Sequence, residues 1–159
     1  MKRLPFALLM MAAVLLAGCG PTHHVFPPDL SVQQLHVDSD GHWQLTLRLR
    51  NYSYDASVHW DHVQVDLTVG AAGAGTIDAG PDIDIAEQSA DVVHTTLDPP
   101  AAARQALAVT NQPGTTTHSI AYTLKGTLEV TGEGGGRQSF PVDRQGWLSP
   151  VPGLSGTWR

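Results

Sequence analysis

Apolar and polar residues alternate along most of the chain after residue 29, and this alternation predicts β-strands. The clearest strand covers residues 43–49, whose apolar positions are Trp43, Leu45, Leu47 and Leu49. Whole or partial alternation also covers residues 30–37, 63–69, 77–85, 90–97, 120–130 and 140–142. About seven strands, each apolar on one side, need a second sheet to cover them, so we expect an all-β antiparallel sandwich of two sheets.

Only one helix is expected, over residues 101–107, with Asp98 as its cap and Pro99 in its first turn. A parallel α/β fold is excluded because the chain offers no crossover helices. Within the strands, a register break is expected near residues 33–34. Gly126 falls on the apolar side of its strand, which predicts a bulge or a close approach of two backbones there.

The first residues have the pattern of a bacterial lipoprotein signal. Lys2 and Arg3 precede a largely apolar stretch, residues 4–17, which is too short to cross a bilayer as a helix. The stretch closes on a sequence that resembles a lipobox, namely Leu16, Ala17, Gly18 and Cys19. We expect residues 1–18 to be the signal peptide and the Cys19 thiol to be the lipid acceptor. The alternative is an ordinary secretory signal that contains a cysteine.

Lipidation of Cys19 would have consequences for stability and for location. It is the only cysteine, so no disulfide within the chain is expected and stability must come from the core. Residues 19–28, rich in proline, read as the lipidated cysteine and its tether. By resemblance to such lipoproteins, Gly20 after the cysteine favours an outer-membrane location facing the periplasm. The expected partner is therefore a membrane, through the lipid anchor.

The charge of the chain argues against nucleic-acid binding. The 159 residues carry a net charge of −6, and without Lys2 and Arg3 the seven remaining basic residues face fifteen acidic ones, a net charge of −8. Phosphate neutralisation needs clustered lysine and arginine, so no nucleic-acid partner is expected. Motifs for a nucleophile elbow, a zinc protease, a P-loop or a dinucleotide site are absent from the sequence. We therefore expect neither catalysis nor a cofactor.

The sequence contains two clusters of candidate metal ligands, and neither predicts a site. His59 and His62 on one strand would point to opposite faces, so residues 59–62 are better interpreted as a loop leading into the strand at Val63. The acidic residues between 78 and 91 do not have the spacing of a calcium loop. They are expected to form a solvated strand face.

Residues 146–159 are apolar but not periodic, and are expected to form a tail outside the sandwich of residues 29–145. Trp147 and Trp158 are candidate partner-binding residues. The alternative, favoured for Trp147, is that Trp147 and Leu148 pack on the sandwich of this chain itself. For Trp158 the sequence leaves both interpretations open.

The stretch from about residue 29 to residue 130 resembles the late-embryogenesis-abundant type 2 family, also called the water-stress and hypersensitive-response domain. The matching features are an opening Pro-Asp-Leu strand, an alternating strand closing on Asn51, the 63–70 strand, and the return through Gly80 to Ile83. The family has Asn-Pro where this chain has Asn51 and Tyr52. The resemblance implies a fibronectin-type-III-like or immunoglobulin-like sandwich of seven strands and one helix, and a role in stress tolerance without catalysis.

The sequence therefore supports two hypotheses of function. The first is a lipid-anchored, non-catalytic envelope protein that protects against desiccation or osmotic stress by binding or shielding. The second is an accessory lipoprotein of the outer membrane that binds a protein or a small apolar ligand, through a cleft between the sheets or through the C-terminal aromatics. The shape of the space between the sheets discriminates the two.

Overall fold

A computed structural model describes residues 24–110 and 119–159, which form an antiparallel β-sandwich. One sheet has the strand order β6-β2-β1-β9, and the other has the order β4-β3-β7-β8, with β5 paired to β3. The elements are β1 (Asp29–Val37), β2 (Trp43–Arg50), β3 (Val58–Val69), β4 (Ala72–Ala79), β5 (Ile83–Ile85), β6 (Ala90–Leu97), α2 (Ala101–Val109), β7 (Ile120–Gly132), β8 (Arg137–Leu148) and β9 (Thr157–Trp158). The predicted all-β sandwich with one short helix is confirmed.

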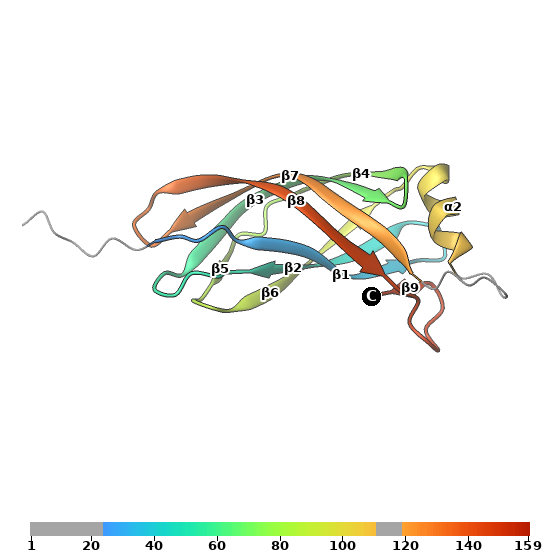
Figure 1. Cartoon of the computed structure of the whole chain (residues 1–159), viewed down its shortest axis with the longest axis horizontal. Coiled ribbons are helices and arrows are strands. Elements are labelled where there is room, and N and C mark those ends of the chain that lie inside the picture. The colour runs from blue at the N-terminus through green and yellow to red at the C-terminus, as the bar shows by residue number, and fades with distance from the viewer. Residues whose placement is uncertain (1–23, 111–118) are drawn as a thin grey trace, which may run out of the picture.

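The sandwich is elongated along its strands, so it has two distinct ends (Figure 1). At the end we call the entry end, the described chain begins beside the 51–57 loop and the β7–β8 turn. At the opposite end, which we call the helix end, α2 and residues 149–159 lie beside the β1–β2 turn. No helix in the described residues is long and apolar enough to cross a membrane.

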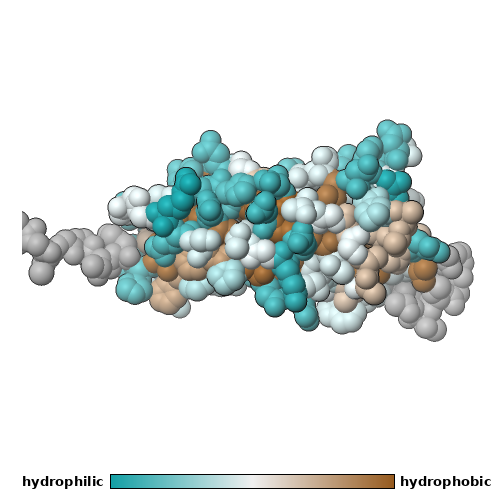
Figure 2. Space-filling model, turned by 90° about the horizontal axis from the view of Figure 1, so that it is seen from above, coloured by the Kyte–Doolittle hydropathy of each residue, from teal (hydrophilic) through white to brown (hydrophobic). Residues whose placement is uncertain are grey.

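The inward faces of the two sheets meet in one apolar core. Strand β2 shows the pattern most clearly, since its odd-numbered residues are buried and its even-numbered residues are more exposed. Each large apolar side chain that is fully buried stabilises the fold by about 1.5–3 kcal/mol relative to the same side chain left exposed. The largest fully buried side chains are Trp43, Trp60, Leu30, Leu35, Leu45, Leu47, Leu49, Leu67, Ile77, Leu107, Leu124 and Leu128. Outside the core, polar side chains cover much of the face shown in Figure 2.

Two predicted irregularities of the strands are confirmed. The register of β1 on β2 shifts between Val32 and Gln34, so a bulge lies at the expected place. At Gly126 the backbones of β3 and β7 approach closely, because a Cβ atom there would collide with the carbonyl group of Gln64. The close approach, and not a bulge, is therefore the reason that this position, which lies opposite Val65 and is itself exposed, holds glycine.

The start of the helix differs from the prediction. The N-cap of α2 is Pro100, and no side chain caps the helix. The Asp98 carboxylate, expected to be the cap, instead accepts a hydrogen bond from the Arg104 guanidinium, at 2.5 Å from Nη2. Two prolines separate Asp98 from the first helical residue, so its side chain is too early in the chain to reach the first free amides.

The sandwich also extends beyond the boundary expected at residue 145. Strand β8 continues through Leu148, which is fully buried. Thr157 and Trp158 form β9, which pairs with β1 through Leu35 and His36. Part of the predicted 146–159 tail is therefore integral to both sheets. The alternation in β8 is hard to see in the sequence because Pro141 and Gly146 interrupt it.

Candidate functional site

The predicted lipidation site lies outside the described residues, as do Leu16, Ala17 and Gly18 of the lipobox and Cys19 itself. The described chain begins at His24, and the end of the predicted tether is fixed to the sandwich. Val25 packs against the core, and the Phe26 amide donates a hydrogen bond to Ser53 Oγ at 3.1 Å. The chain therefore enters the fold at a defined place, beside the 51–57 loop.

Asn51, which the family resemblance singled out, is a fully buried hub at the entry end. Its Nδ2 donates to the carbonyl oxygens of Ala56, Ile85 and Ala86, at 2.9, 3.1 and 3.2 Å. Its Oδ1 accepts a hydrogen bond from the Ser53 amide at 2.8 Å. One side chain thus joins the loop after β2 to the chain that follows β5. Its role is structural, since burial leaves it no surface for a ligand.

Three exposed aromatic residues, Phe26, Tyr52 and Tyr54, form what we call the aromatic patch of the entry end. The rings of Phe26 and Tyr54 meet edge to face, with centroids 5.8 Å apart. The Arg50 guanidinium lies over the Tyr52 ring, 4.6 Å from its centroid. Nothing in the sequence pointed to this patch, because its members belong to a tether and a loop that have no periodic pattern.

The two tryptophans proposed to bind a partner differ in their exposure. Trp147 is 70% exposed, so the favoured prediction that it packs on the sandwich is wrong, although its neighbour Leu148 is buried. Trp158 is only 4% exposed, and its Nε1 donates to Thr110 Oγ1 at 2.9 Å. Trp158 therefore closes the helix end of the core, and of the two only Trp147 has an exposed ring.

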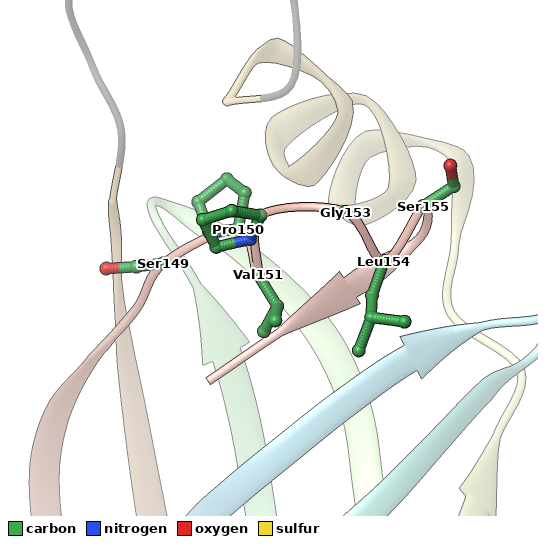
Figure 3. Close-up of a pocket in the computed structure, with 7 residues that line it drawn as sticks. Ser149, Pro150, Val151, Gly153, Leu154 and Ser155 are labelled. Carbon is green, nitrogen blue, oxygen red and sulfur yellow. The ribbon is translucent and has the colours of Figure 1, made fainter.

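The C-terminal segment encloses a hollow of about 660 Å³ lined by residues 149–155. Val151 and Leu154 project to the same side of this loop, whereas Ser149 and Ser155 project outward (Figure 3). The lining comes from one continuous loop, and Leu154 is exposed. A hollow built in this way has no convergent polar groups, which a specific ligand site requires.

A smaller and more apolar pocket, of about 370 Å³, lies between α2 and the end of the core. We call it the subhelical pocket. Its lining residues are Val37, Trp43, Arg104, Leu107, Ala108, Gly156 and Trp158. Arg104 is the only charged residue of the lining, and its guanidinium pairs with Asp98, so an apolar ligand with an anionic end would compete with that carboxylate for Arg104.

Residues 59–62 lie within β3, so their interpretation as a loop is wrong. A bulge between Trp60 and His62 allows Trp60 and Val63 both to face the core. As a result, His59 and His62 share the outer face, where the sequence analysis expected them on opposite faces. Each imidazole nevertheless has its own acidic partners, and the two do not converge on one point.

The outer face of β3 carries a cluster centred on His59. Its Nδ1 lies 2.9 Å from Asp84 Oδ1, and its Nε2 lies 3.3 Å from Asp82 and 4.0 Å from Asp61. The hydrogen bond with Asp84 raises the pKa of His59 above 6.5, with further contributions from the charges of Asp84, Asp61 and Asp82. Among residues 24–110 and 119–159, no three metal-ligating side chains converge as a metal ion would require.

The acidic residues between 78 and 91 are exposed, as predicted for a solvated face, and three of them, Asp78, Asp82 and Asp84, pair with histidines. Asp84 pairs with His59, and Asp78 Oδ1 lies 2.7 Å from Nε2 of His62. These contacts tie the β4 and β5 edge to β3. A purely solvated face was therefore too simple a description.

Tyr122, which the sequence analysis did not single out, connects the two sheets. Its hydroxyl oxygen accepts a hydrogen bond from the Val32 amide at 3.1 Å, at the bulge of β1. Burial raises the pKa of Tyr122 above 10, and the bond to Val32 partly offsets this. A Cβ atom at Gly146 would collide with the Tyr122 ring, so glycine at that position makes room for it.

Comparisons with known proteins give the following likenesses. No family model matches the chain, and no curated protein matches it. A solution structure of a protein from Arabidopsis thaliana has a TM-score of 0.48 and 12% identity, over 87% of each chain. A solution structure of a protein described as late embryogenesis abundant has a TM-score of 0.46 and 18% identity, over 91% of this chain and 82% of that one. A crystal structure of a protein from Archaeoglobus fulgidus has a TM-score of 0.43 and 9% identity, over 80% of this chain and 98% of that one. These values are too low to carry an argument about what this chain does.

Proposed function

We propose that this protein is a lipid-anchored, non-catalytic protein of the cell envelope that protects against desiccation or osmotic stress by binding or shielding. The lipobox-like sequence ending in Cys19 supports the anchor and an outer-membrane location facing the periplasm. The late-embryogenesis-abundant type 2 resemblance of residues 29–130 supports the stress role.

One structural observation supports this hypothesis over the ligand-binding alternative, and that is how the sheets fill the space between them. Strands β2, β3 and β7 contribute large apolar side chains that are fully buried, so the middle of the sandwich is occupied by its own core. A core packed in this way stabilises the fold without a disulfide. The acidic surface keeps the folded domain hydrated beside a membrane.

The test is survival of a strain from which the gene has been deleted. We expect desiccation and osmotic shock to lower the survival of this strain, and the wild-type gene to restore it. The Cys19→Ser protein, expressed at the same level, should restore it less because it is not held at the membrane. Unchanged survival of the deletion strain under both stresses would contradict the stress role.

The alternative function, binding of a small apolar anion, is favoured by the subhelical pocket. An apolar lining beside Arg104 suits such a ligand. The anionic dye 1-anilinonaphthalene-8-sulfonate is a direct probe, and Ala108→Trp should block its binding by filling the pocket. Ala102→Trp, at an exposed position of α2, is the matched control. Equal dye fluorescence in both variants would exclude this site.

A further inference from the structure

The aromatic patch has the composition of a surface that contacts a lipid interface. Tyr54 is 75% exposed, Phe26 43% and Tyr52 38%, although aromatic side chains of this size are usually more buried. Tyrosine combines an apolar ring with a polar hydroxyl, so it is favoured at the level of lipid headgroups. The Arg50 guanidinium lies over the Tyr52 ring, so it places a positive charge beside the patch that can attract lipid phosphate groups.

The patch is assembled from two separate segments that are held together. Phe26 belongs to the entering chain, whereas Tyr52 and Tyr54 belong to the loop after β2. The hydrogen bond from the Phe26 amide to Ser53 Oγ and the edge-to-face contact between Phe26 and Tyr54 join these segments. Asn51 fixes the start of the loop from inside the fold. Phe26 and Tyr54 are therefore held in contact, and Tyr52 lies two residues before Tyr54 on the same loop.

The length of chain before Phe26 identifies what covers the patch. Cys19 precedes Phe26 by seven residues, so even a fully extended chain keeps the two within about 25 Å of each other. Val25 packs on the core, which fixes the point where the chain leaves the sandwich. A bilayer that holds lipids attached to Cys19 must therefore lie close to the entry end.

The helix end offers a contrasting surface that the same anchor does not bring to the membrane. It displays Trp147 and Leu154, which are 70% and 57% exposed. The end of β8 and the segment that follows it, to which these residues belong, lie at the far end of the elongated sandwich from the entering chain (Figure 1). Exposed apolar residues thus occur at both ends, and those of the entry end lie beside the point where the described chain begins.

We propose that the aromatic patch rests in the headgroup layer of the bilayer that carries the lipids of Cys19, so that the sandwich stands on its entry end. The inference rests on the proposed lipid anchor and adds an orientation to it. The helix end, with Trp147 and the subhelical pocket, is then directed away from the membrane.

The test uses the full acylated protein in vesicles of phosphatidylethanolamine and phosphatidylglycerol, with bromine on the acyl chains near the headgroup as a quencher. Trp147→Phe first removes the exposed native tryptophan, and Phe26→Trp then places a reporter in the patch. We expect brominated lipids to quench at least half of the added emission. The comparison is the wild-type protein, which keeps Trp147 and has no reporter at position 26. Brominated lipids should leave its Trp147 emission unchanged.

A matched pair of charged substitutions separates the patch from the anchor. Tyr54→Glu should reduce the quenching of the reporter at position 26 several-fold, whereas Leu154→Glu, at the helix end, should leave it unchanged. Mass spectrometry of the same samples reports acylation of Cys19. An acylated protein whose reporter is not quenched overturns the orientation and leaves the proposed function intact. A protein without acyl chains on Cys19 overturns both.

Discussion

The two ends of the sandwich are closed by different chemistry. At the helix end, the closing residue is a large apolar side chain, Trp158, whose single polar atom bonds to Thr110. At the entry end, the closing residue is a small amide, Asn51, which satisfies four backbone groups of the surrounding loops. An end covered by a helix can be sealed by packing, whereas an end made of loops must first satisfy its buried backbone groups.

The largest effect is expected at the helix end. Trp158→Ala should lower the free energy of unfolding by about 3–5 kcal/mol, because it removes a large buried ring and leaves a cavity. Urea denaturation followed by circular dichroism measures this difference. Trp147→Ala, eleven residues earlier in the sequence but exposed, is the matched control and should change stability by less than about 0.5 kcal/mol. Equal effects of the two substitutions would contradict the assignment of Trp158 to the core.

At the entry end, Asn51→Ala should cost about 3 kcal/mol, because it leaves several buried backbone groups without partners. The same denaturation measurement applies, with Gln44→Ala as a control that removes an exposed amide from the other end of β2. Amide hydrogen exchange should also accelerate in residues 53–57 more than in α2. If exchange instead accelerates equally at both ends, Asn51 does not act as a local hub.

Between the ends, Tyr122→Phe tests the bond that joins the sheets. The substitution keeps the ring and removes only the hydroxyl that accepts from the Val32 amide. Leaving that amide unpaired should cost about 1–3 kcal/mol. Tyr54→Phe, which changes an exposed hydroxyl, is the control for the denaturation midpoint. If Tyr122→Phe lowers the stability no more than Tyr54→Phe does, the hydrogen bond between the sheets is dispensable.

The smallest effect is expected on the outer face of β3, from the titration of His59. Its pKa is raised in the folded state, so the protonated form contributes stability below pH 6.5, and this contribution is lost as the pH rises through the raised value. Asp84→Asn should move the pKa of His59 back toward 6.5, measured by NMR titration of the imidazole. Asp78→Asn, which alters the partner of His62, should leave the titration of His59 unchanged. If Asp78→Asn shifts the pKa of His59 more than Asp84→Asn does, the role of Asp84 is refuted.

Sequence reasoning was most successful in the middle of the sandwich. The alternation over 43–49 and the break near residues 33–34 both appear in the structure, because a half-buried strand must place its apolar residues on one side. The position of Gly126 was also informative, since a glycine at an apolar position of the alternation signals a close approach of two backbones.

Sequence reasoning failed where a local irregularity or a distant partner decides the outcome. The bulge at residue 61 changes which face His62 occupies, and no residue type in that stretch signals it. Trp147 and Trp158 have similar surroundings in the sequence, but only Trp158 meets β1 and Thr110. The aromatic patch depends on a contact between residues 26 and 54 that local patterns do not report.

The pairing of β1 with β9 has a consequence for how the molecule is made. His36 bonds to Thr157 across more than a hundred intervening residues, and Leu35 lies opposite Trp158 in the register. During synthesis or export, one edge of β1 therefore stays unpaired until residues 157–158 have emerged. Contacts of such long range slow the completion of a fold. This delay would keep a chain that crosses a membrane unfolded until the crossing is complete. During that time the unpaired edge of β1 can associate with other chains.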